Sequence, residues 1–143
     1  MKKVLNFDMD GTISDLYGVT DWLPRIKNYD PSPYAEARPC LRLCDLARQL
    51  NRLHTDGYQI NIISWLSKSS TRKYDAQVVR AKYEWITRHL PSVTFDRIMI
   101  VPYGTPKNLL ADGYLFDDEE QNRAEWGEGA YDPSEILTIL KGL

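Results

Sequence analysis

The sequence predicts an α/β protein in which helices cover a mostly parallel, Rossmann-like β-sheet, giving three layers. Short apolar runs rich in β-formers alternate with longer segments that have helical spacing. Buried strands that alternate with helices are typically joined by right-handed crossovers, which make neighbouring strands parallel. Acidic and hydroxyl residues follow several of the predicted strands, where ligands of such sheets bind.

We expect strands at residues 3–7, 58–64, 97–101 and 113–116. Helices are expected at residues 34–54, which Asp56-Gly57 ends, and at residues 71–90, which Pro91 stops. A last helix over 135–141 would use Asp132 as its cap and Pro133 as its first residue. Residues 11–33 hold several prolines and aromatic residues, so they are expected to form a loop or small lid.

The composition indicates one globular domain spanning residues 1–143, with a flap at about 14–33. A net charge of -2 argues against binding polyanions by bulk charge, and no stable nucleic-acid partner is expected. No apolar run approaches the roughly 20 residues that span a bilayer, and Asp8 and Asp10 interrupt any signal-like start. We therefore expect a cytoplasmic protein, in which Cys40 and Cys44 are two buried, reduced thiols.

Two carboxylates, Asp8 and Asp10, come directly after the first predicted strand, and Gly11 allows a sharp turn there. Carboxylates in this place can bind a hard cation, and one of them can attack phosphorus. A calcium-binding EF-hand loop is excluded, because its twelfth position is Val19 and not glutamate.

A second acidic pair, Asp117 and Asp118, follows the fourth predicted strand, so both pairs should meet at one edge of the sheet. Several carboxylates in one place repel each other unless a cation neutralises them. Magnesium fits this set of oxygen ligands, and no histidine or cysteine nearby favours zinc.

Three further residues are candidates for holding a phosphate. Ser64 ends the second predicted strand, and its hydroxyl can donate a hydrogen bond to a phosphate oxygen. Trp65 follows Ser64 in the sequence, so its side chain can form part of the wall of the phosphate-binding pocket. Lys107 lies at the start of a predicted helix, where its ammonium group can hold the nucleophile and the phosphate together.

In this order, these residues resemble the motifs of the haloacid dehalogenase-like (HAD) hydrolase superfamily. The first motif is Phe7-Asp8-Met9-Asp10-Gly11-Thr12, and the others are Ile62-Ile63-Ser64, Lys107 and Tyr114-Leu115-Phe116-Asp117-Asp118, with Asn122 following. The resemblance covers residues 3 to about 122 and implies a HAD-like fold. The short stretch between the first two motifs leaves room only for a small flap in place of a full cap domain.

The resemblance also implies roles. Asp8 would form an aspartyl-phosphate, and Asp10 would protonate the leaving oxygen and then activate water. Mg²⁺ would be held by the Asp8 side chain, the Asp10 carbonyl and an aspartate of the fourth motif. Asp118 is favoured for that position, although Asp117 and Asp118 could exchange roles. Ser64 and Lys107 would bind the transferring phosphoryl group.

A further likeness, in Ala81-Lys82-Tyr83-Glu84-Trp85-Ile86, is to 5'(3')-deoxyribonucleotidases, and it implies a nucleoside (deoxy)monophosphate substrate. Because the flap is short, a phosphorylated protein or nucleic-acid end stays open as an alternative substrate. A non-catalytic phosphate-binding regulator also stays open, as does a homodimer whose partner closes the site.

Overall fold

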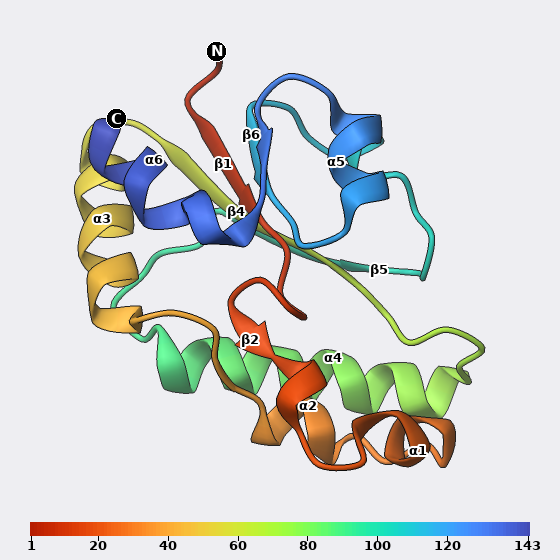
Figure 1. Ribbon diagram of the computed structural model, residues 1–143. Coiled ribbons are helices and arrows are strands. Elements are labelled where there is room, and N and C mark those ends of the chain that lie inside the picture. The colour runs from red at the N-terminus through yellow and green to blue at the C-terminus, as the bar shows by residue number, and fades with distance from the viewer.

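Five parallel strands form the central sheet of the protein, in the order β5-β4-β1-β6-β7 (Figure 1). The computed structural model describes residues 1–143. The strands in chain order are β1 (Val4–Phe7), β4 (Gln59–Trp65), β5 (Arg97–Val101), β6 (Tyr114–Phe116) and β7 (Ala130–Tyr131). The four strands expected from the sequence are all present, and β7 is an additional edge strand.

Helices flank the sheet, which confirms the predicted α/β fold. Figure 1 shows α3 (Leu43–Thr55) and α6 (Ile136–Gly142) on one side of the strands and α5 (Glu120–Trp126) on the other. The long helix α4 (Arg72–His89) shares the main core with α3 and α6. That core combines Leu46 and Leu50 of α3, Trp85 of α4 and Leu140 of α6 with the apolar residues of the strands.

The register of the sheet brings the ends of three strands to one edge. Phe7, the last residue of β1, pairs with Ile62 of β4 on one side and with Phe116, the last residue of β6, on the other. The rings of Phe7 and Phe116 stack with their centroids 5.0 Å apart. Since parallel strands end on the same edge, the residues that follow β1 and β6 must be neighbours.

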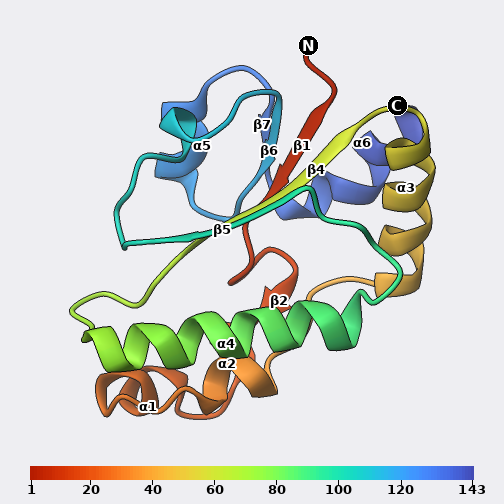
Figure 2. The same ribbon diagram turned by 180° about the vertical axis from the view of Figure 1, so that it is seen from behind.

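Residues 14–39, which we call the lid, lie between β1 and α3. The two-stranded antiparallel ribbon of β2 (Ser14–Asp15) and β3 (Arg38–Pro39) joins the ends of the lid. Between them lie the 3-10 helix η1 (Leu16–Gly18) and two short helices, α1 (Trp22–Lys27) and α2 (Ser32–Glu36). Figure 2 shows both helices beside α4.

The lid has its own small core, which fastens it to α4. Leu16 and Tyr34 of the lid are buried against Tyr74, Val78 and Ala81 of α4. The segment contains helices where an irregular loop was expected, and it extends beyond Pro33 to Pro39.

The prediction of a single helix over residues 34–54 is wrong in its first third. The chain leaves α2 at Ala37, which has an extended backbone (φ -55°, ψ 133°), and Pro39 cannot donate a helical hydrogen bond. A new helix starts only at Leu43. Helix α5 was not expected at all, and Lys107 lies in the 3-10 helix η2 (Lys107–Leu109).

The prediction of two buried thiols is also wrong, because Cys40 and Cys44 are both exposed. Cys40 precedes α3, and Cys44 lies on the side of α3 opposite to the buried Leu46, Leu50 and Leu53. None of the helices combines the length and the apolar character that crossing a bilayer requires.

Candidate active site

A cavity of about 790 Å³ opens at the carboxyl edge of the sheet, beneath the lid. From the sheet side it is lined by the acidic and basic residues Asp8, Asp10, Lys107 and Asp118. Its other walls come from the lid, the end of β4, α4 and the loop after β5, and they are largely aromatic: Tyr17, Trp22, Tyr29, Tyr34, Trp65, Tyr74 and Tyr103. The cavity thus has a charged end and aromatic walls.

Asp8 is held in place at the end of β1 by several hydrogen bonds. Its backbone N–H donates to the Phe116 carbonyl oxygen at 3.0 Å, continuing the pairing of β1 with β6. Its carboxylate oxygen Oδ1 accepts from Lys107 Nζ at 2.8 Å, and Oδ2 accepts from the Thr12 hydroxyl at 3.0 Å. Asp8 is only 7% exposed, so this carboxylate has one fixed orientation at the cavity wall.

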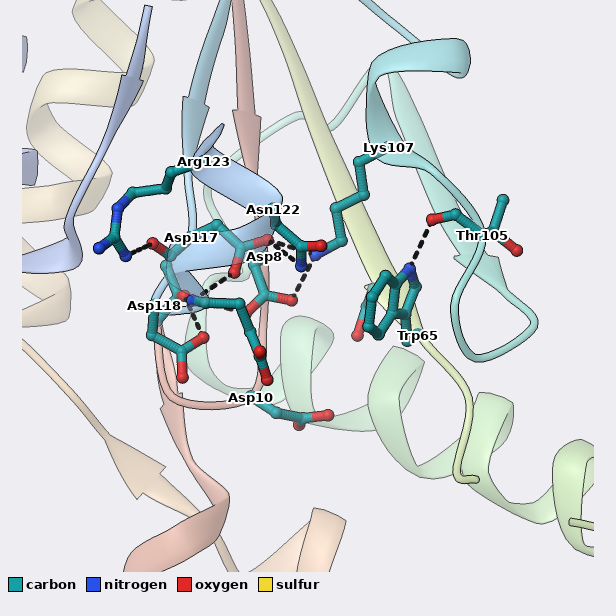
Figure 3. Close-up of polar contacts among 12 residues, drawn as sticks. Asp8, Asp10, Trp65, Thr105, Lys107, Asp117, Asp118, Asn122 and Arg123 are labelled. Carbon is teal, nitrogen blue, oxygen red and sulfur yellow. Dashed lines mark hydrogen bonds and ion pairs between the residues drawn. The ribbon is translucent and has the colours of Figure 1, made fainter. Parts of the chain in front are cut away.

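Lys107 links the two acidic motifs (Figure 3). Its Nζ atom lies 2.8 Å from Asp8 Oδ1 and 2.7 Å from Asp117 Oδ2, and all three residues are buried. Burial lowers the pKa of Lys107, but the carboxylates of Asp8 and Asp117 outweigh it, so the net shift is upward. The lysine therefore stays charged and compensates part of the local negative charge.

Asp117 is fully engaged with the protein. Besides Lys107, its carboxylate accepts from Asn122 Nδ2 at 3.1 Å and from the Glu119 backbone N–H at 2.9 Å. The Arg123 guanidinium donates to its carbonyl oxygen at 2.9 Å. Asp117 is completely buried, so its carboxylate orients Lys107 and α5 around the site.

Asp118, by contrast, faces the cavity with few partners, and its closest side-chain hydrogen bond is a long one from Thr12 at 3.4 Å. Carboxylate oxygens of Asp8, Asp117 and Asp118 all lie within 4.8 Å of one another. Burial first, and then the charge of Asp8, raise the pKa of Asp118 to about 8 and that of Asp117 to about 6. This cluster has more negative charge than Lys107 alone compensates.

Gly11 allows the turn that brings these carboxylates together. Its φ is +83°, and a Cβ atom built there would lie 2.3 Å from Asp118 Oδ2 and 2.8 Å from Tyr17 Cε2. A side chain at position 11 is therefore incompatible with both the backbone and the acidic cluster.

Asp10 does not join the cluster with its side chain. Its Oδ2 atom instead forms an ion pair with Lys82 Nζ at 3.0 Å. Burial raises the pKa of Asp10 more than the neighbouring charge of Lys82 lowers it, and Asp8 adds to the rise. Asp10 still lines the cavity, so it can exchange a proton with a bound molecule.

Ser64 is completely buried and does not line the cavity, and its hydroxyl oxygen accepts a hydrogen bond from Lys82 at 2.6 Å. Trp65, which follows it, does line the cavity. Its indole N–H donates to the Thr105 carbonyl at 2.9 Å, and Lys107 Nζ lies 5.5 Å from the centroid of its ring. Trp65 therefore forms a fixed wall beside the charged end of the cavity.

Sequence reasoning did not assign a role to Lys82. Its position in α4 contains a signal, because Val78, Lys82 and Ile86 repeat at intervals of four residues on the buried face of the helix. A lysine in an apolar stripe must find acceptors for its ammonium group. Thr12 was seen only as part of the first motif, although its hydroxyl contacts both Asp8 and Asp118.

No protein-family model and no curated protein matches the sequence. The structure, however, is similar to crystal structures of two D,D-heptose 1,7-bisphosphate phosphatases. The enzyme from Burkholderia thailandensis aligns with a TM-score of 0.59 and 14% identity, over 99% of this chain and 97% of that one. The enzyme from B. bronchiseptica, complexed with magnesium and phosphate, aligns with a TM-score of 0.61 and 14% identity, over 99% of both chains. The chain therefore has the fold of these phosphatases.

Proposed function

We propose that the protein is a magnesium-dependent phosphohydrolase of the HAD-like type, which cleaves phosphomonoesters through an aspartyl-phosphate on Asp8. The observation that carries this proposal is the buried bridge from Lys107 to Asp8 and Asp117, at the charged end of the cavity. The bridge orients a carboxylate nucleophile and places an ammonium group where phosphate oxygens would lie. The fold shared with known phosphatases supports the same reaction.

The residues at this edge fit a magnesium ion. Oxygen atoms of three carboxylates lie within 4.8 Å of one another, and the pKa values of Asp117 and Asp118 are raised. A divalent cation bound there would relieve the repulsion between these carboxylates. Asp8 and Asp118 would ligate the ion directly, with the Asp10 carbonyl, while Asp117 stays bonded to Lys107. A bound Mg²⁺ would neutralise charge that develops on the phosphoryl oxygens.

The proposed reaction has two steps. In the first, an Asp8 carboxylate oxygen forms a bond to phosphorus, the ester P–O bond breaks, and the leaving oxygen takes the proton of Asp10. In the second, Asp10 accepts a proton from water, the water oxygen bonds to phosphorus, and the bond to Asp8 breaks. The products are an alcohol and inorganic phosphate, and both aspartates return to their starting states.

A nucleoside (deoxy)monophosphate is the proposed substrate. The aromatic walls of the cavity offer surfaces on which a planar base can stack. Among them, Tyr17 and Trp22 contact each other edge to face, with their ring centroids 4.9 Å apart. The lid also covers a cavity of small-molecule size, which favours a small substrate over a protein or nucleic-acid end.

Hydrolysis assays test the proposal. The wild-type protein and the Asp8→Asn variant would be compared on an aryl phosphate, with Mg²⁺ and with EDTA. We expect turnover only for the wild type with Mg²⁺, and a phosphate adduct on Asp8 found by mass spectrometry after acid quenching. Activity that survives Asp8→Asn would refute the mechanism, and no activity on any ester would indicate a phosphate-binding regulator.

A substrate panel then tests the proposed specificity. It includes nucleoside 5'- and 3'-monophosphates, sugar monophosphates, a sugar bisphosphate and a phosphopeptide. We expect the highest kcat/KM for a nucleoside monophosphate. A higher value for the sugar bisphosphate would assign the chain a specificity like that of its structural neighbours and reject the nucleotide proposal.

A further inference from the structure

Lys82 is a deeply buried charge near the cavity to which the proposed reaction assigns no role. It lies in the middle of α4, and its side chain is 1% exposed. Long lysine side chains usually reach water with their ammonium group, and burial of the charge is costly unless acceptors surround it. Its surroundings should therefore show what this charge does.

All three hydrogen-bond donors of the Lys82 ammonium group have a protein acceptor. Nζ lies 3.0 Å from Asp10 Oδ2, 2.6 Å from Ser64 Oγ and 2.7 Å from the Trp65 carbonyl oxygen. An ammonium group has three N–H bonds, so none is left for a phosphate oxygen. The ring of Tyr34, from the lid, lies over the same nitrogen at 5.1 Å and shields it from water.

These contacts hold Asp10 by one oxygen only. Lys82 occupies Oδ2, while Oδ1 makes no hydrogen bond within the chain, and Asp10 lines the cavity with its side chain 17% exposed. A carboxyl group held in this way has a fixed orientation and one oxygen free to exchange a proton with a bound molecule. The other two acceptors, at the end of β4, anchor Lys82 to the sheet.

We propose that Lys82 is a positioning residue for proton transfer: it fixes the orientation of Asp10 relative to the leaving oxygen without contacting the substrate. The inference rests on the proposed function, in which Asp10 gives its proton to that oxygen as the ester P–O bond breaks. It adds a residue of α4, outside the strand ends, to the groups on which the first step depends.

Leaving-group dependence separates positioning of the acid from a structural role. An aryl phosphate with an acidic phenol releases its leaving group as an anion and needs little protonation, whereas an alkyl phosphate needs the proton of Asp10. For Lys82→Met we expect kcat/KM to fall roughly 10- to 100-fold more on the alkyl ester than on the aryl ester. Lys141→Met, an exposed lysine on α6, is the matched control and should leave both values unchanged.

Each other outcome has a defined meaning. Equal losses on the two esters, or no loss on either, would overturn the inference. If wild-type protein hydrolyses neither ester, the proposed function itself fails. Urea unfolding checks that Lys82→Met is folded. If Lys82→Met is not folded, the same comparison is made with Lys82→Gln, which keeps an N–H donor beside Asp10. Its loss of kcat/KM on the alkyl ester, relative to its loss on the aryl ester, should be smaller than that of Asp10→Asn.

Discussion

The Nζ atom of Lys107 lies almost equally far from Asp8 and Asp117, at 2.8 Å and 2.7 Å. One ammonium group thus bridges two carboxylates that directly follow different strands, β1 and β6, and lie far apart in the sequence. Breaking a buried ion pair by removing one partner leaves the other charge uncompensated, which is costly. Lys107 therefore matters both for the local fold and for the proposed reaction.

Replacing Lys107 with Met should lower kcat on an aryl phosphate by about 100-fold or more, because the group that holds Asp8 and is proposed to bind the phosphate is lost. In EDTA the free energy of unfolding should also fall by about 3 kcal/mol, as measured by urea denaturation. Lys141→Met is the control for removing a surface charge. Unchanged turnover in Lys107→Met would contradict the assignment of the site.

Removing magnesium should make stability depend on pH. The pKa of Asp118 is raised to about 8 and that of Asp117 to about 6, so the metal-free folded state binds more protons than the unfolded state between about pH 4 and 8. The stability of the metal-free protein should therefore fall as the pH rises through this range, and Mg²⁺ should restore it most at the alkaline end.

Thermal unfolding with EDTA and with Mg²⁺, at several pH values, measures this effect. Asp118→Asn removes the more strongly shifted group, so its metal-free Tm should fall less with pH, and Mg²⁺ should raise its Tm less than it raises that of the wild type. Glu128→Gln, an exposed site, is the control. If Mg²⁺ stabilises Asp118→Asn as strongly as the wild type, Asp118 is not a ligand.

Gly11 and Gly57 make a matched pair for testing the turn. Both have a positive φ, +83° and +91°, but a Cβ atom would contact Asp118 at position 11 and nothing within 4 Å at position 57. Gly57→Ala should cost about 1–2 kcal/mol of stability from backbone strain. Gly11→Ala should cost more and should also weaken Mg²⁺ binding. Equal effects of the two substitutions on Mg²⁺ affinity would contradict the packing described for Asp118.

Tyr17 tests the aromatic wall of the cavity. It is 44% exposed, lines the cavity and contacts Trp22 edge to face. Tyr17→Leu should raise KM for a nucleoside monophosphate by about 3- to 10-fold, the size of one lost aromatic contact. KM for glycerol phosphate, which has no ring to stack, should stay the same. Tyr83→Leu, an exposed tyrosine on α4, is the control, and a similar rise for both substrates would count against stacking.

Much of the fold was predictable because buried parallel strands correspond to short apolar runs in the sequence. The pattern also predicted that Asp8, Lys107 and Asp117 lie at one edge of the sheet. Asp8 and Asp117 directly follow predicted strands, and Lys107 comes at a predicted helix start. The lid was harder to predict. Its helices are short, and they are stabilised by the contact of Leu16 and Tyr34 with α4, which local sequence does not reveal.

The partners of individual side chains were also beyond sequence reasoning. Ser64 was expected to face a phosphate, but in the structure its oxygen accepts from Lys82. That hydrogen bond uses an acceptor of Ser64 and leaves its hydroxyl hydrogen available, so the predicted phosphate contact stays a prediction. The hydrogen bond between Lys82 and Ser64 depends on how α4 packs against the sheet. Periodicity along one helix does not specify that packing.

The ribbon formed by β2 and β3 also has a consequence for how such a protein can change. Because Ser14 pairs with Pro39, the chain enters and leaves the lid at one place, and the segment between them adds no strand to the central sheet. That segment could be lengthened, shortened or exchanged as a cassette without rebuilding the sheet edge that holds Asp8 and Lys107. Substrate preference could then diverge quickly in related proteins while the reaction itself is inherited unchanged.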